Sequence, residues 1–176
     1  RWTAKNSLDW IEYQQNGVLM NLKSRDGWSS LWHKYMQKKI REVPKKIYCV
    51  SEESDELPSF QDLQLEFDGL KPNTNFGNSK PNTVLESFLN QRGENYQREM
   101  SGPQLSEYSC SRMSTHIAFG TISIRTIFQR TQERAKKNKD LSGGTKKTWQ
   151  ASYNSFLKRL RWHCHFIQKL EDLRSI

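Results

Sequence analysis

Apolar residues recur at helical spacing in several separate stretches of this chain. Apolar residues at every third or fourth position predict an amphipathic helix whose apolar face packs against a core. The longest such stretch begins near Thr145, after the glycine pair 143–144, and runs to the end of the sequence. Its apolar positions are Trp149, Tyr153, Phe156, Leu160, His163, Ile167 and Leu170. The pattern predicts a long C-terminal helix with one buried face.

The N-terminal region shows the same spacing in shorter segments. Residues 7–14 predict a short helix, which is interrupted at Asn16-Gly17 and continued by Val18, Leu19 and Leu22. Asp26 is the predicted N-cap of the next helix. The apolar set of that helix is Trp28, Leu31, Trp32, Tyr35 and Met36.

Two more helices are predicted in the second half of the chain. Thr83 and Glu86 have the spacing of a capping box, and this helix should end near Gly93. Residues 94–108 are predicted to be loop. Ser123 should cap the second helix, whose apolar set is Ile124, Ile127, Phe128 and Ala135.

Between these regions, residues 51–80 are first acidic and then rich in Asn, Pro, Gly and Lys, with only scattered apolar residues. Such a composition is typical of a linker or a long surface loop. The predicted organisation is a helical segment over 1–50, a linker over 51–80 and a helical region over 81–176. The fold class is therefore mostly α.

Residues 109–120 combine small polar side chains with the start of a short helix. Ser114 is a candidate N-cap, and Gly120 is a natural stop. Backbone N–H groups at such a helix start can bind an anion. An ordinary capped helix explains the same residues, and the stretch alone does not decide between the two.

The charge of the chain is unevenly distributed. The sequence has 28 Lys plus Arg and 19 Asp plus Glu, a net charge of +9. Residues 110–176 hold 14 basic and 4 acidic residues, a net charge of +10, so the whole excess lies there. This favours a polyanionic partner such as nucleic acid, although a solvated helix surface has a similar composition.

A second stripe runs along the predicted C-terminal helix and contains Ser155, Arg159, Trp162 and Phe166. Arg159 and Trp162 are three residues apart and should be neighbours on the helix surface. An indole beside a guanidinium suits an aromatic heterocycle that carries phosphate. The alternative is a cation–π pair at a helix–helix contact.

Other chemistries find little support in the sequence. His163 and His165 lie about 200° apart around a helix axis, so they cannot readily share one metal ion, and no metal site is predicted. The three cysteines do not form a disulfide framework, and no apolar run is long enough for a membrane span. We therefore expect a reducing, cytoplasmic compartment and no membrane partner.

Two separated stretches resemble motifs of the photolyase/cryptochrome family. Residues 110–123, Cys-Ser-Arg-Met-Ser-Thr-His-Ile-Ala-Phe-Gly-Thr-Ile-Ser, resemble its Thr-Ser-x-Leu-Ser-x-x-Leu-x-x-Gly-x-x-Ser motif, where hydroxyls and backbone amides hold the FAD diphosphate. Residues 156–166, Phe-Leu-Lys-Arg-Leu-Arg-Trp-His-Cys-His-Phe, are similar to its Trp-x-x-Glu-Leu-x-Trp-Arg-Glu-Phe helix, which lines the flavin pocket. Residues 14–31 look like the segment that leaves the family's antenna domain.

The resemblance implies a cofactor, a partner and a set of site residues. The cofactor is FAD, with a second antenna chromophore in a domain outside this chain, and the partner is DNA, bound by a monomer. Arg159 would pair with FAD phosphate or DNA, and Trp162 would stack against the damaged base. The FAD-contacting residues would be Tyr96, Ser111, Met113, Ser114, Phe156 and His163.

The implied activity is light-driven electron transfer from FAD to pyrimidine dimers by a photolyase-like lyase, of which this chain is a fragment. It would span the interdomain linker and the first part of the helical FAD-binding domain. Two departures leave alternatives open: Cys110 replaces a Thr, and Arg159 replaces a Glu that can supply a proton, which Arg cannot do. The alternatives are a cryptochrome-like photoreceptor without repair and a basic helical module that binds nucleic acid without flavin.

Overall fold

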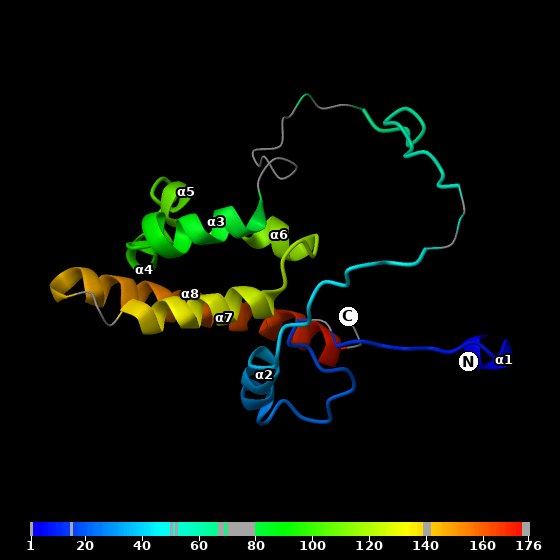
Figure 1. Ribbon diagram of the computed structural model, residues 1–176, viewed down its shortest axis with the longest axis horizontal. Helices are drawn as coiled ribbons and strands as arrows, with labels where there is room; N and C mark the ends of the chain where they lie inside the picture. Colours follow the sequence, from blue (N-terminus) through cyan, green and yellow to red (C-terminus); the bar gives the residue numbers. More distant parts are fainter. Residues whose placement is uncertain are drawn as a thin grey trace. The chain divides into compact units, whose positions relative to one another are not determined.

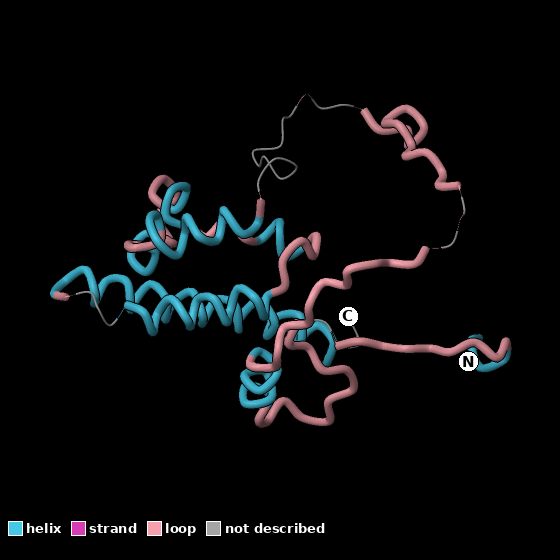
Figure 2. Tube along the Cα trace, viewed as in Figure 1, coloured by secondary structure: helices cyan, strands magenta, loops and turns pink. Residues whose placement is uncertain are grey.

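The computed structural model describes residues 2–14, 16–49, 51, 53–66, 69, 80–138 and 142–173. Helices dominate these ranges and no strand occurs in them (Figure 2), which confirms the mostly α class. The chain divides into two compact units. One unit contains residues 1–40 and 80–176, and the other contains residues 41–79.

The first unit holds all the helices of the described residues. Most of them are short, and the long elements α7 and α8 pack against each other (Figure 1); α2 packs against α7, and α4 against α8. The elements are α1 (Trp2–Lys5), α2 (Trp28–Met36), α3 (Pro81–Ser87), the π-helix η1 (Phe88–Arg92), α4 (Tyr96–Glu99), α5 (Ser106–Ser109), α6 (Ser114–Ala118), α7 (Ile124–Lys137) and α8 (Gly143–Asp172).

The core lies where α2, η1 and α4 meet the paired helices α7 and α8. Its centre is aromatic: the rings of Trp32 and Phe128 meet edge to face at 5.2 Å between centroids, and those of Phe88 and Phe156 at 4.7 Å. Edge-to-face pairs of this kind are favourable beyond the area they bury. The apolar faces predicted for α2 and α7 are thus confirmed as part of the core, except at Leu31 of α2, which is 46% exposed.

The predicted apolar face of α8 is right over its first half and wrong over its second. From Leu160 onward the buried line continues through Cys164 and Gln168, whereas Ile167 and Leu170 are exposed. Gln168 explains the change, because its side-chain amide pairs with the backbone of Leu19, accepting from the N–H at 2.7 Å and donating to the carbonyl at 2.8 Å. The end of α8 packs against polar main chain, so a polar residue is buried there.

The helices predicted over residues 7–14 and 18–22 are absent, and α1 forms instead at residues 2–5. The apolar side chains of residues 8–14 have no core to pack on, and Trp10 is 71% exposed. Helices of this length are marginal in water without packing. The predicted cap at Asp26 is also wrong: Gly27, at φ +73°, is the N-cap of α2, and Asp26 accepts a hydrogen bond from Ser24.

Three boundaries in the second half need correction, and two are confirmed. The helix α3 begins at Pro81 rather than after a Thr83 cap, because proline suits the first helical turn. The predicted loop over 94–108 contains the short helices α4 and α5, and α8 starts at Gly143. The helical run that begins at α3 does end before Gly93, and the Ser123 side chain caps α7 by accepting from the Thr126 N–H at 3.0 Å.

The second unit has no helix or strand among its described residues, which are 41–49, 51, 53–66 and 69. A turn over 59–64 is its main ordered feature: the Asp62 carboxylate accepts from the Ser59 N–H at 2.8 Å and from its hydroxyl at 2.6 Å. The linker predicted over 51–80 covers much of this unit, and positions 52, 67, 68 and 70–79 lie outside the described residues.

Candidate cofactor-binding site

The loop at residues 110–113, which the sequence singles out, is held in place by Arg92 at the end of η1. The Arg92 guanidinium donates to the carbonyls of Cys110 and Ser111, the latter at 2.7 Å, and its Nε donates to the Ser87 hydroxyl at 2.9 Å. Longer bonds reach the carbonyls of Val84 at 3.3 Å and Tyr108 at 3.4 Å. A planar guanidinium is suited to joining several carbonyls in fixed geometry.

These bonds orient the peptide groups of the loop. In a trans peptide the C=O and the N–H point in opposite directions, so the N–H groups of Ser111 and Arg112 face away from Arg92. Arg112 has φ +59° and Met113 follows in the right-handed helical region. Successive residues of opposite hand bring their N–H groups together into a concavity that suits an anion.

The helix after this loop starts differently from the prediction. Ser114 is the first residue of α6, and Met113 takes the N-cap position without a side-chain hydrogen bond. The predicted cap at Ser114 is therefore wrong, and its hydroxyl lies on an exposed residue. The Met113 N–H donates to the Ser111 hydroxyl at 3.4 Å, so the candidate anion-binding groups of this stretch are the N–H groups of Ser111 and Arg112 rather than a capped helix start.

Three of the predicted FAD contacts lie in the core. Tyr96, Met113 and Phe156 are 6%, 1% and 3% exposed, and the ring centroids of Tyr96 and Phe156 are 5.9 Å apart. Burial raises the pKa of Tyr96 to about 12, with a smaller contribution from Cys110 that Arg159 opposes. Tyr96 is therefore a neutral phenol at physiological pH. Because all three side chains are buried, they stabilise the loop and α8 from the side of the core.

Arg159 joins the two motif stretches. Its charge acts on Tyr96 and on Cys110, so the middle of α8 lies within electrostatic range of the start of the loop. Burial raises the pKa of the Cys110 thiol, and the charges of Arg112, Arg92 and Arg159 oppose the shift without reversing it. The thiol is therefore uncharged, and the charges of three arginines act on it.

His163 and Trp162 lie further along α8. Burial lowers the pKa of His163, so its imidazole is neutral at pH 7. Trp162 is 48% exposed, the Arg159 guanidinium lies 4.8 Å from its ring centroid, and its ring meets that of Phe166 edge to face at 6.3 Å. The predicted arginine–indole pair is confirmed, and it is on the surface rather than at a helix–helix contact.

Within the described ranges, no three His, Cys, Asp or Glu side chains come together in a way that suits a metal ion. The three cysteines are free thiols. No described helix has the length and apolar character needed to cross a membrane.

Sequence reasoning missed Arg92, which organises the site. Its signal is weak, because a single arginine before a glycine is an ordinary helix end. The π-helical turn that directs it toward the loop has no recognisable sequence pattern.

Comparison with known proteins identified no match: no family model, no curated protein and no solved structure is similar to this chain.

Proposed function

We propose that the loop at residues 110–113 and the middle of α8 form the part of a flavin site that binds the FAD diphosphate. The observation that carries the proposal is that the two stretches resembling photolyase/cryptochrome motifs share one core: Met113 of the first is buried in the same cluster as Phe156 and Leu160 of the second. The charge of Arg159 also acts on Cys110. Residues so far apart in sequence need not come together, so this convergence supports the proposal.

The chemistry of the site suits a diphosphate. The N–H groups of Ser111 and Arg112 point away from the Arg92 clamp, and guanidinium groups pair with phosphate oxygens. In this proposal Ser111, Ser114 and Arg159 contact the cofactor, and the neutral His163 donates or accepts a hydrogen bond. The FAD roles of Tyr96, Met113 and Phe156 are proposed to be indirect, since these side chains are buried.

When bound, FAD would supply the ring that absorbs light and transfers an electron. The whole protein would then be a photolyase-like enzyme acting on pyrimidine dimers, with DNA bound by Trp162 and Arg159, or a cryptochrome-like photoreceptor. Arg159 favours the photoreceptor or a divergent repair enzyme, because arginine does not release a proton at accessible pH.

The test is a calorimetric titration of the chain with FAD and, as a control, with riboflavin, which has no diphosphate. We expect saturable binding of FAD only, lost in Arg159→Glu and retained in Lys158→Glu, an equal charge change at an adjacent exposed residue. Equal binding of riboflavin, or FAD binding weaker than about 1 mM (about −4 kcal/mol), would contradict the proposal.

A second candidate is a nucleic-acid-binding module without flavin. The exposed stack of Arg159 on Trp162 favours it, since bases stack on indoles with little regard to sequence. Binding of single-stranded DNA that falls steeply with salt, together with no FAD binding, would support this function instead.

A further inference from the structure

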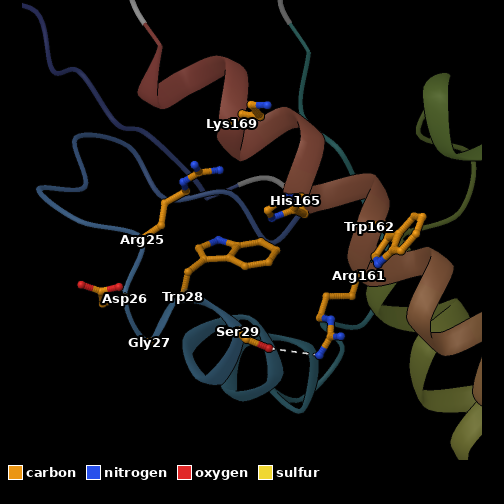
Figure 3. A pocket seen from close by; sticks show the side chains of 9 residues that line it. All are labelled: Arg25, Asp26, Gly27, Trp28, Ser29, Arg161, Trp162, His165 and Lys169. Carbon is orange, nitrogen blue, oxygen red and sulfur yellow. Dashed lines mark hydrogen bonds between the residues drawn. The ribbon is translucent and has the colours of Figure 1, made fainter.

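A cleft outside the candidate flavin site lies between the loop that leads into α2 and the second half of α8. Its volume is about 680 Å³. Figure 3 shows Arg25 on the loop side, across from His165 and Lys169 on α8, with Trp28 between them. Its lining residues are Arg25, Asp26, Gly27, Trp28, Ser29, Arg161, Trp162, His165 and Lys169.

The lining of this cleft has an excess of positive charge. Three full cations line it against one carboxylate, Asp26, which accepts a hydrogen bond from Ser24 at 2.8 Å. Arg25 is paired with Asp172 at 3.3 Å, just outside the lining. Among the described residues, Arg161 and Lys169 have no carboxylate within ion-pair distance.

Arg161 is positioned rather than free to move. Its Nη1 donates to the Ser29 hydroxyl at 3.2 Å, the bond drawn in Figure 3, which leaves its charge without a counter-ion. That charge acts on the neighbouring His33, where it adds to burial in lowering the imidazole pKa. An anion that enters the cleft would therefore meet two uncompensated cations.

The cleft also has aromatic surface. The Trp28 indole N–H is already used by the Gly17 carbonyl, and its ring packs at 5.7 Å against His165, so it forms the floor. Trp162 lines the cleft and is 48% exposed, which leaves ring area for stacking. Apolar ring surface beside unpaired cations is the combination that a nucleotide needs, and an acidic peptide would use only the charge.

We propose that this cleft binds a nucleotide phosphate, with Lys169 and Arg161 on the phosphate and Trp162 beside the base. Its lining includes none of the residues proposed to contact FAD, although Trp162 touches Arg159, and Trp162 is also part of the proposed nucleic-acid contact. The same chemistry is present in a free nucleotide and in a DNA strand, and the experiment below separates these two sources.

The test measures fluorescence anisotropy of a dye-labelled single-stranded oligothymidylate with the intact chain, in the absence of flavin. We expect Lys169→Glu to weaken binding by roughly tenfold at low salt and Arg161→Gln to weaken it by a few-fold. Each variant should also reduce the slope of log affinity against log salt by about 1. The matched control is Lys158→Glu, also on α8 and exposed but outside the lining, which should change affinity less than twofold. Thermal melting of each variant establishes that it is folded.

Competition then identifies the source of the ligand. Displacement of the oligonucleotide by thymidine monophosphate, sensitive to Lys169→Glu, assigns the cleft to a free nucleotide, and resistance to it assigns the cleft to a strand. Displacement by inorganic phosphate as effective as that by the nucleotide would overturn the base contact. Equal losses in Lys169→Glu and Lys158→Glu would overturn the site.

The outcome is independent of the flavin site. A chain that binds FAD but no oligonucleotide refutes this inference and leaves the proposed flavin site intact. A chain that binds the oligonucleotide through Lys169 but does not bind FAD supports this inference and refutes the proposed flavin site.

Discussion

Replacing Arg92 should reveal how strongly the loop at residues 110–113 depends on one side chain. In Arg92→Met the three short hydrogen bonds to Cys110, Ser111 and Ser87 are lost, together with the cation–π contact of the guanidinium with the Phe88 ring at 5.6 Å. Hydrogen bonds to a charged group contribute about 1.5–3 kcal/mol each. Because Arg92 is only partly buried, water can replace some of them.

We therefore take about 3 kcal/mol as the expected loss in the free energy of unfolding, which is more than a hundredfold in the unfolding equilibrium constant. The measurement is urea unfolding followed by tryptophan fluorescence, since Trp28, Trp32 and Trp149 are buried in the core. A loss of 3 kcal/mol is a large share of the roughly 5–15 kcal/mol that stabilises a typical domain.

Arg92→Lys separates geometry from charge. A single ammonium group cannot reach the Ser87 hydroxyl and two loop carbonyls at once, so we expect a loss of about 2 kcal/mol. Arg98→Met is the control: the Arg98 side chain on α4 is exposed and makes no hydrogen bond or ion pair in the described part of the chain, so the change in stability should be less than about 0.5 kcal/mol. If Arg92→Met is as stable as Arg98→Met, the hydrogen bonds of Arg92 do not hold the loop in place.

Three further predictions concern the core and its polar bonds. Gly17→Ala would place a Cβ 2.0 Å from Trp32 Cδ1 and should cost about 1–3 kcal/mol, whereas Gly144→Ala, in open space on α8, should stabilise by about 0.5–1 kcal/mol; thermal melting checks both signs. Burial raises the pKa of Tyr153 from 10.0 to about 12, so this phenol should lower stability by up to about 1.4 kcal/mol per pH unit between pH 10 and 12; Tyr96, whose pKa is also about 12, adds a similar fall, so the slope should be smaller in Tyr153→Phe without disappearing. Gln168→Leu leaves a main-chain N–H and carbonyl unpaired and should cost about 2–3 kcal/mol in urea unfolding, and an unchanged midpoint would contradict that bond.

The sequence predicts best the helices whose apolar faces meet each other. The residues on α7 and on the first half of α8 are buried as their spacing indicates, because each face packs against the other and against α2. The prediction fails where the partner of a face is not an apolar face: at Gln168 the partner is main chain, and the side chains of Leu8, Trp10 and Ile11 are exposed. The spacing of apolar residues predicts which face of a helix is buried, but it does not predict which segment packs against that face.

The candidate site follows the same division. Residue type and helical spacing were enough to predict that Arg159 and Trp162 form a pair, and they do. The spacing of residues in the sequence could not predict the orientation of the loop peptides, because that orientation depends on Arg92, which bonds to a carbonyl eighteen residues later in the chain. The cleft beside Trp28 could not be predicted from the sequence either, because its cations come from two segments with no shared motif.

The π-helical turn η1 makes the site sensitive to chain length at one point. Its closing bond runs from the Gly93 N–H to the Phe88 carbonyl, five residues apart, and a Cβ at Gly93 would lie 2.4 Å from that oxygen. Removing one residue such as Asn90 would restore α-helical pairing and rotate everything after it by about 100° relative to α3. Arg92 would then face away from the loop.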